Sequence, residues 1–360
     1  MWDVTKRGWW AVFLRKKKGV VGLDIGSSAV KLVELKAAKG GRFGLLHAAH
    51  APLSPEAIVE GTVMDSSLVV EVAQRLIQEQ GVKNPSFGIS LSGISVAIRK
   101  IQVPAMSEAE LAESIHWEAE QYLPFDVNEV NLDYVVLGSD ADTMDVLLVA
   151  AKKDRIADYT GIVTQLGKTP VLVDVDVFAL QNAFEYNYGV AADRVVALVN
   201  VGAHIMNVNI LAHGQSVFWR DIVFGGNAYT EAIQRELNLT REQAEAVKTG
   251  EQLGDHTPQT ILGVLNGVSE DLAAELQKTF EFFYTTSSHD HVEEVVLAGG
   301  SCQVLNLDEV LKERLRARVE VMNPFREIEY SESQFPPEWL NRHAPSMAAA
   351  VGMALRTAGE

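Results

Sequence analysis

The first candidate for chemistry is a carboxylate beside a glycine turn. In VVGLDIGSSAVKLVEL, residues 20–35, Asp24 ends an apolar run typical of a buried strand. Gly26, Ser27 and Ser28 then form a tight turn before a second, alternating strand, and these small residues leave backbone N–H groups open. A carboxylate at the end of a buried strand is costly unless a cation or a water network meets it. The hairpin therefore predicts a polar site at its mouth.

A second stretch repeats this pattern. VVALVNVGAHIMNVNIL, residues 195–211, sets Asn200 over Asp24 and Gly202 over Gly26, and both stretches predict strand, glycine turn and strand. This internal similarity suggests two related lobes, each of which opens on a glycine hairpin.

Two further glycine pairs stand before predicted helices. Gly225 and Gly226 precede the helical pattern NAYTEAIQREL, and Gly299 and Gly300 follow the buried strand VEEVVLA. Exposed N–H groups at the start of a helix, together with the positive end of its dipole, suit a phosphate or the edge of a nucleotide. We therefore predict that the turn at 299–300 contacts such a ligand.

The elements that must position these residues follow from periodicity. A helical pattern ends at Gly81, and FGISLSGISVAIRKIQVP predicts a strand pair. Ser107 and Glu110 form a capping-box pattern that opens a helix, and two strands and another helix follow it. Residues 85–168 therefore predict a compact α+β unit with two layers.

Composition limits the classes of function. The 360 residues have room for two or three domains. A net charge of −17 argues against general nucleic-acid binding, which needs a basic surface. One cysteine excludes an intramolecular disulfide framework and suits a reducing cytoplasm. The most apolar long segment is interrupted by Asn200, His204 and Asn207, so we expect no transmembrane helix.

The first 18 residues differ from the rest of this acidic chain. They carry six Lys or Arg residues against a single acidic residue, Asp3, and on a helix Trp2, Trp9 and Phe13 would lie close together. One interpretation is a weak anchor on an anionic membrane, where each basic residue contributes about 1 kcal/mol. The other is a basic leader whose aromatic side chains pack on the body of the protein. The residues alone leave both open.

The order of the motifs is more specific than any one of them. DIGSSAVK, VDVDVFALQ, NVGAHIM, GGNAYTEAI, AEAVK, LAGGS and APSMAAAVG follow one another across residues 19–356, and this order resembles the actin-like ATPase superfamily. GLDIGSSAVKLVEL together with IRKIQVPAMSEAELAESIHWEAEQYLPF is similar to the PilM family of type IV pilus assembly proteins. The resemblance implies an α/β fold, the two-lobed actin-like (ribonuclease H-like) ATPase fold, with an α+β subdomain inserted in the first lobe.

The resemblance also implies domain boundaries. Beyond the basic aromatic segment at 1–18, we expect the first lobe at 19–84, 169–193 and 344–360, the inserted subdomain at 85–168, and the second lobe at 194–343.

The implied ligands are ATP and Mg²⁺. By resemblance, both hairpins hold the phosphates, Lys31 supplies a cation to them, and Asp24 meets Mg²⁺ through its water shell. Glu245 and Lys248 match the AExxK pattern that flanks the ribose and base, and the turn at 299–301 holds the adenosine. The implied nucleotide-binding residues are Asp24, Gly26, Ser27, Ser28, Lys31, Asn200, Gly202, Ala203, Gly225, Gly226, Glu245, Lys248, Gly299, Gly300 and Ser301.

The second hairpin departs from the superfamily pattern. Asn200 stands where Asp is usual, and Met206 occupies the usual Thr position. Affinity for ATP survives such an exchange more readily than hydrolysis does, because a water misplaced by an ångström costs on the order of 10²-fold in rate. We therefore expect hydrolysis to be slow or absent. Asp174 or Asp176, before the helix at 177–185, is the candidate to orient a water.

The resemblance further implies a scaffold for pilus assembly and twitching motility. Such a protein lies at the cytoplasmic face of the inner membrane and holds the short cytoplasmic tail of a PilN-like bitopic membrane protein. The expected groove lies between the first lobe and the inserted subdomain, where an extended peptide could use strand edges. Contacts with other pilus platform proteins, motor ATPases, the membrane surface or further copies of the chain stay open, and no nucleic-acid partner is expected.

Two rival functions fit the same superfamily. An FtsA-like division filament would carry a C-terminal amphipathic membrane helix, whereas this chain ends in MALRTAGE after its packing helix. An actin-fold small-molecule kinase would need a catalytic Asp in a substrate pocket between the lobes, and the sequence has no signature of one.

Two other possible ligand sites are weak. His289, Asp290 and His291 resemble metal ligands but fall in a polar loop without a third partner nearby. Cys302 has no histidine near it in the sequence, so we expect an ordinary buried thiol.

Overall fold

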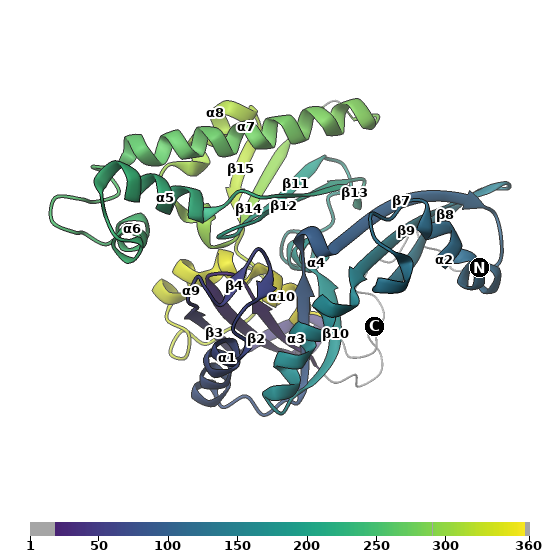
Figure 1. Ribbon diagram of the computed structural model, residues 1–360, viewed down its shortest axis with the longest axis horizontal. Helices are drawn as coiled ribbons and strands as arrows, with labels where there is room; N and C mark the ends of the chain where they lie inside the picture. The colour runs from purple at the N-terminus through teal and green to yellow at the C-terminus, as the bar shows by residue number, and fades with distance from the viewer. Residues whose placement is uncertain (1–18, 290, 357–360) are drawn as a thin grey trace.

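Residues 19–289 and 291–356 are described by the computed structural model, in which two lobes lie against each other and a smaller unit projects from one side (Figure 1). The predicted basic segment at 1–18 lies outside the described residues. Each lobe is built on a five-stranded sheet, and the projecting unit on a three-stranded one.

The sheet of the first lobe has the order β10-β6-β1-β2-β3. The first hairpin pairs β1 with β2 in antiparallel fashion, whereas β6 runs parallel to β1. Alternate residues of β2 enter different cores: Val30 and Leu32 face α1 and α3, and Val33 and Leu35 face α4. The elements of this lobe are β1 Val21–Ile25, β2 Ala29–Ala37, β3 Phe43–Pro52, α1 Ser66–Gln80, β6 Ser86–Leu91, α3 Lys153–Gln165, β10 Thr169–Val175 and α4 Asp176–Tyr188.

The sheet of the second lobe has the order β13-β12-β11-β14-β15 and repeats this plan. Its central strand β11 pairs antiparallel with β12 and parallel with β14, as β1 does with β2 and β6. The similarity of the two hairpins in sequence is therefore a similarity of the two lobes in topology. The elements are β11 Val196–Val201, β12 Met206–Ala212, β13 Gln215–Ile222, α5 Gly226–Leu237, α6 Arg241–Lys248, α7 Leu262–Thr286, β14 Glu294–Ala298, α8 Leu307–Leu315 and β15 Arg318–Val321.

The projecting unit is the insert. Helix α2, Glu108–Glu120, begins with the predicted capping box and buries Leu111, Ile115 and Ala119 against one face of the sheet β7-β9-β8. The strands are β7 Val96–Pro104, β8 Val130–Ser139 and β9 Thr143–Lys152.

The insert is narrower than the predicted 85–168. Strand β6 pairs with β1 and β10 in the first sheet, so β6 and β7 are not a strand pair as predicted. Helix α3 packs Ile162 and Val163 into the core beneath α1. Both segments belong to the first lobe, which leaves 96–152 for the insert.

The predicted end of the second lobe at 343 is also too late. Glu329 forms a parallel bridge with Gly44 at the outer edge of β3, and its carbonyl accepts from Leu45 N at 2.8 Å. Phe325, Ile328 and Leu340 share a core with Leu45. The segment 323–343 therefore covers the edge of the first sheet.

The last helices close the first lobe. Helix α10, Ala348–Ala354, packs on α4 so closely that a Cβ at Gly352 would overlap the backbone of Ala179, as expected for a small-residue helix. The remaining elements are β4 Ile58–Val59, β5 Thr62–Val63 and α9 Pro337–His343. None of the described helices is both long and apolar enough to cross a membrane.

Candidate functional site

A cavity of about 880 Å³ lies in the cleft between the two lobes. Its walls come from segments far apart in the chain: both hairpins, the start of α4, helix α6 and the turn after β14. Most of the predicted nucleotide-binding residues line it, and these are Asp24, Gly26, Ser27, Ser28, Lys31, Asn200, Gly202, Ala203, Glu245, Lys248, Gly299, Gly300 and Ser301.

The first hairpin carries an ion pair at its mouth. Asp24 and Lys31 are cross-strand partners in β1 and β2, and Lys31 Nζ lies 3.1 Å from Asp24 Oδ2. Their side chains are only 17% and 12% exposed, so the cation that a buried Asp24 requires is supplied from within the hairpin. Gly26 N donates to Ala29 O, and this closes the turn.

The second hairpin replaces the ion pair with two amides. Asn200 and Asn207 are cross-strand partners, and Asn200 Nδ2 donates to Asn207 Oδ1 at 2.9 Å. Asn207 Nδ2 donates in turn to Asp221 Oδ1 at 2.8 Å. Met206, which the sequence set at the usual Thr position, is fully buried in the core of the second lobe. Because side chains alternate along β12, Asn207 lines the cavity and Met206 does not.

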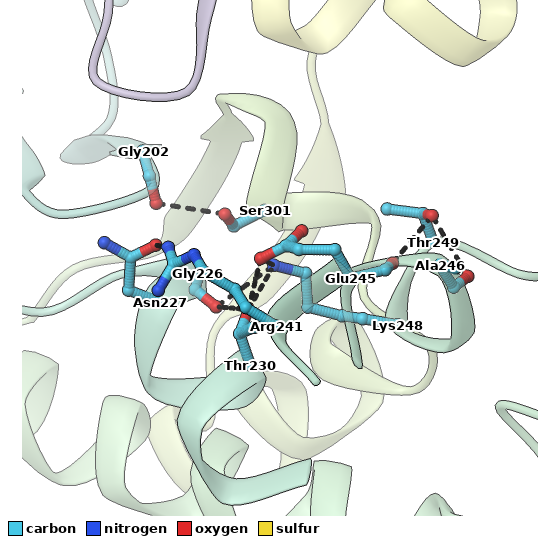
Figure 2. A network of polar contacts seen from close by, with 10 residues as sticks. All are labelled: Gly202, Gly226, Asn227, Thr230, Arg241, Glu245, Ala246, Lys248, Thr249 and Ser301. Carbon is cyan, nitrogen blue, oxygen red and sulfur yellow. Dashed lines mark hydrogen bonds and ion pairs between the residues drawn. The ribbon is translucent and has the colours of Figure 1, made fainter. Parts of the chain in front are cut away.

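Helix α6 brings a charged pair to the cavity (Figure 2). Lys248 Nζ lies 2.7 Å from Glu245 Oε1 and donates to Thr230 Oγ1 and to the Gly226 carbonyl. Thr230 also donates to Glu245. Burial lowers the pKa of Lys248, and the adjacent Glu245 carboxylate opposes that effect.

The glycine pair at the start of α5 supports the cavity from behind. Gly225 and Gly226 do not line it, contrary to expectation. Gly226 N donates to the Gly202 carbonyl at 2.9 Å, and a Cβ at Gly225 would overlap the backbone of Ala203. The two glycines therefore let α5 approach the second hairpin, and the next residue, Asn227, lines the cavity in their place.

The turn after β14 lines the cavity but does not begin a long helix. Gly299 has a φ of +89°, and residues 300–303 form a short 3-10 turn before α8 starts at Leu307. Ser301 Oγ donates to the Gly202 carbonyl at 3.0 Å (Figure 2). The predicted helix follows the turn but starts later than expected, at Leu307, so the turn at 299–300 does not carry the N-terminus of α8.

The two candidate aspartates have different surroundings. Asp174 does not line the cavity and forms an ion pair with Arg356, Nε to Oδ2 at 3.1 Å. Asp176, at the start of α4, lines the cavity. Burial and, to a smaller extent, the Asp24 carboxylate raise the pKa of Asp176 to about 6, and the hydroxyls of Ser90 and Ser92 oppose the shift.

Several cavity residues escaped the sequence analysis. Arg241 Nη2 donates to Asn227 Oδ1 at 2.7 Å, one helical turn before Glu245 on the same face of α6. That i, i+4 spacing was a signal that could have identified Arg241. Asn207 lies within the second hairpin stretch, but its position was not singled out. Others come from elements with no motif and carry no such signal: Ser90, Ser92, Arg155, Tyr159, His343 and His50.

Two of these residues form a pair of imidazoles in contact. The ring centroids of His50 and His343 lie 4.6 Å apart with the rings tilted by 32°, and the ring of Trp339 lies 4.9 Å from that of His343. Burial and the nearby Lys31 lower the pKa of His50 to about 3, so its ring is neutral at pH 7. Burial also lowers the pKa of His343.

The two weak candidates outside the cavity are accounted for in different ways. Cys302 is buried and burial raises the pKa of its thiol to about 12, so it is the ordinary thiol expected. His289 stacks on Phe283 at 5.8 Å, whereas its neighbour at 290 lies outside the described residues.

Two lobes of like topology around a polar cleft define an actin-like ATPase fold. The ethanolamine utilization protein EutJ from Carboxydothermus hydrogenoformans shares this fold, with a TM-score of 0.58 at 15% identity over 93% of this chain and 89% of that one. The chain belongs to the PilM family: the model described as Type IV pilus assembly protein PilM matches residues 22–358.

A solved structure entitled PilM-PilN type IV pilus biogenesis complex is more similar still. Its matching chain is 30% identical, with a TM-score of 0.84, and the match covers 94% of this chain and 98% of that one. The protein therefore has a role in type IV pilus assembly. The family and the fold predicted from the sequence are both confirmed.

Proposed function

We propose that the protein binds ATP with Mg²⁺ between its lobes and serves as a scaffold of the pilus assembly platform. The observation that carries the first part is the cavity itself, which has a glycine turn and polar side chains from each of two related hairpins on opposite walls. Open N–H groups beside a lysine are the chemistry that phosphates require.

The residues divide into two groups in this proposal. Ser27, Ser28 and Lys31 would hold the phosphates from the first lobe, and Asp24, which now pairs with Lys31, would meet Mg²⁺ through its water shell. The α6 face with Arg241, Glu245 and Lys248 holds the ribose and base. Bound Mg²⁺ would supply charge neutralisation at the phosphates.

Turnover is slow in this proposal. Asp176 is the remaining carboxylate placed to orient a water, and its raised pKa leaves it partly protonated near pH 6. The second hairpin offers amides where an acid would polarise a water. We expect a rate well below the median enzyme value of about 10 s⁻¹.

Calorimetry tests nucleotide binding directly. Titration of the purified protein with ATP, with and without Mg²⁺, should show saturable binding that Mg²⁺ strengthens. No binding at millimolar ATP, which needs only about −4 kcal/mol, would contradict the proposal. His289→Ala is a suitable control because His289 lies outside the cavity.

The scaffold part of the proposal concerns a peptide partner. The similar chain of known structure is named as part of a complex with PilN. We infer that this protein likewise holds the short cytoplasmic tail of a PilN-like membrane protein, in the seam between the first lobe and the insert. Strand β10 ends the first sheet there, and Val173 on it is 40% exposed, so an extended peptide has an edge to pair with.

A seam variant tests the position of the tail. Val173→Asp should weaken binding of a peptide that copies the partner tail by at least tenfold, because it buries a carboxylate under the peptide. Val59→Asp introduces the same change at a site 47% exposed and away from the seam, and should leave binding unchanged. Equal loss in both variants, or in neither, would contradict the seam as the groove.

Such a tail would hold the protein at the cytoplasmic face of the inner membrane. The basic segment at 1–18 adds, in this proposal, a weaker electrostatic attachment that salt screens. Deletion of 1–18 should therefore leave peptide binding intact and reduce only salt-sensitive binding to anionic vesicles. Further partners among platform proteins and motor ATPases, and oligomers of the chain, would assemble on this tethered form.

A further inference from the structure

The loop at 92–95 lies where the first lobe, the second lobe and the insert meet. It connects β6 of the first sheet with β7 of the insert, and Ser92 lines the cavity. Two hydrogen bonds tie this root of the insert to β13 of the second lobe. Gly93 N donates to Asp221 Oδ2 at 2.5 Å, and Trp219 Nε1 donates to the Ile98 carbonyl at 2.9 Å.

Asp221 also ends a row of three polar side chains across three neighbouring strands. Asn200, Asn207 and Asp221 are successive cross-strand partners on β11, β12 and β13, so their side chains share one face. The carboxylate therefore uses one oxygen for Asn207 at the cavity and the other for Gly93 at the insert.

A carboxylate at this end determines how both amides point. An ionised carboxylate only accepts hydrogen bonds, so Asn207 must turn its NH₂ to Asp221 and its oxygen to Asn200. Asn200 must then turn its NH₂ to Asn207, which leaves its own oxygen beside Gly299 at the cavity. Asp221 thus makes an amide present an acceptor oxygen where the superfamily has an acid.

Asp221 is an exposed residue, but both of its carboxylate oxygens accept from N–H groups. It forms no ion pair among the described residues. Partial desolvation of the carboxylate raises its pKa, and the N–H groups of Asn207 and Gly93 oppose that shift. Because each oxygen has a different donor, the carboxylate keeps this orientation only while both hydrogen bonds are present.

We infer that Asp221 is a positioning residue for the ATP site, and that it joins this site to the root of the insert, so that nucleotide binding and the placement of the insert depend on each other. The inference rests on the ATP binding proposed above.

The test compares Asp221→Asn with the full-length wild-type protein. The amide at 221 has one acceptor oxygen in place of two. It therefore loses the hydrogen bond from Gly93 N or the one from Asn207 Nδ2, unless Asn207 and Asn200 both turn their amides around. We expect ATP–Mg²⁺ affinity to fall about tenfold in calorimetry, as the loss of one charge-assisted hydrogen bond predicts. In hydrogen exchange, ATP should protect the amides of 93–99 in the wild type and not in the variant.

A double variant separates orientation from stability. Adding Asn207→Asp to Asp221→Asn moves the carboxylate one strand inward, where it accepts from both neighbouring amides, and frees the amide oxygen at 221 for Gly93 N. The ATP affinity of the double variant should return to within about threefold of the wild type, a smaller change than the loss of one hydrogen bond would cause. Asp271→Asn, an exposed site on α7, is the matched control and should change neither measurement.

The outcomes are distinct. Wild-type protein that binds no ATP overturns the proposed function and this inference together. Wild-type binding with unchanged affinity and unchanged protection in Asp221→Asn overturns the inference alone. A loss of affinity that the double variant fails to restore also overturns it, because general destabilisation would then account for the loss.

Discussion

The two hairpins share a backbone and differ in the polar pair that they carry. The first pairs Asp24 with Lys31 by an ion pair, and the second pairs Asn200 with Asn207 by an amide hydrogen bond. Both pairs stand at equivalent places, where the central strand of a sheet meets its antiparallel neighbour at the cleft.

The difference shows how each hairpin satisfies its polar groups. The charged pair is self-contained, because the lysine neutralises the carboxylate within two strands. In the amide pair, the orientation of each amide group is fixed only because a third strand contributes Asp221 as an acceptor. The first hairpin is thus suited to a local role at the phosphates, and the second to a role that extends into the rest of the protein.

The largest effect should come from the charged hairpin. Lys31→Ala removes a cation from the proposed phosphate site and leaves Asp24 unpaired, so ATP affinity should fall on the order of 100-fold, the value of a strong charge-assisted hydrogen bond. Calorimetry with ATP–Mg²⁺ measures it. Lys36→Ala, an exposed lysine on the same strand, is the control. Unchanged affinity in Lys31→Ala would mean that the first hairpin does not hold the phosphates.

A second prediction contrasts the turn glycines. A Cβ at Gly202 would lie 2.7 Å from the Ile205 carbonyl, whereas one at Gly26 would lie 2.8 Å from Lys31 Nζ, the end of a flexible side chain. Gly202→Ala should therefore destabilise the fold by about 1–3 kcal/mol, a typical cost of overpacking, and Gly26→Ala by less. Urea denaturation compares them. A larger loss of unfolding free energy in Gly26→Ala than in Gly202→Ala would contradict this prediction, because the Lys31 side chain can move and the Ile205 backbone cannot.

A third prediction concerns pH. Because burial and Asp24 raise the pKa of Asp176 to about 6, the native state binds more protons than the unfolded state between about pH 4 and 6. As pH rises from about 4 to 6, the free energy of unfolding of the wild type should therefore fall relative to that of Asp176→Asn, by roughly 1–3 kcal/mol in total.

Urea denaturation at intervals from pH 4 to 7 measures this difference. Asp193→Asn, an exposed site, should show no such trend. A gap between Asp176→Asn and the wild type that stays constant with pH would mean that Asp176 titrates as in the unfolded chain.

The smallest effect should come from restoring the acid of the second hairpin. In Asn200→Asp the new carboxylate still accepts from the Asn207 amide, so ATP affinity should stay within about threefold, less than one hydrogen bond is worth. Phosphate release should be preserved or increased. Asn341→Asp, at an exposed side chain that does not line the cavity, is the control. A variant that loses ATP binding would show that the neutral amide is required at this position.

Local sequence was sufficient for much of the fold and site. Alternation in residues 20–35 and 195–211 predicted both hairpins. The resemblance carried by the order of the glycine motifs predicted the two lobes, and most of the nucleotide-binding residues it implied line the cavity. These features are local, because a strand's apolar face and a tight turn depend on neighbouring residues. The capping box at Ser107 is local in the same way.

Tertiary structure alone decided the rest. Which sheet β6 joins depends on its pairing with β1, and the same alternating pattern would suit the insert equally well. Asp174 turns to Arg356, 182 residues away, while Asp176 reaches the cavity. Asp221 had no motif at all, and its place beside Asn207 follows from the register of β13 on β12. A strand's pattern determines which side chains share a face, but only packing of the whole chain determines what that face meets.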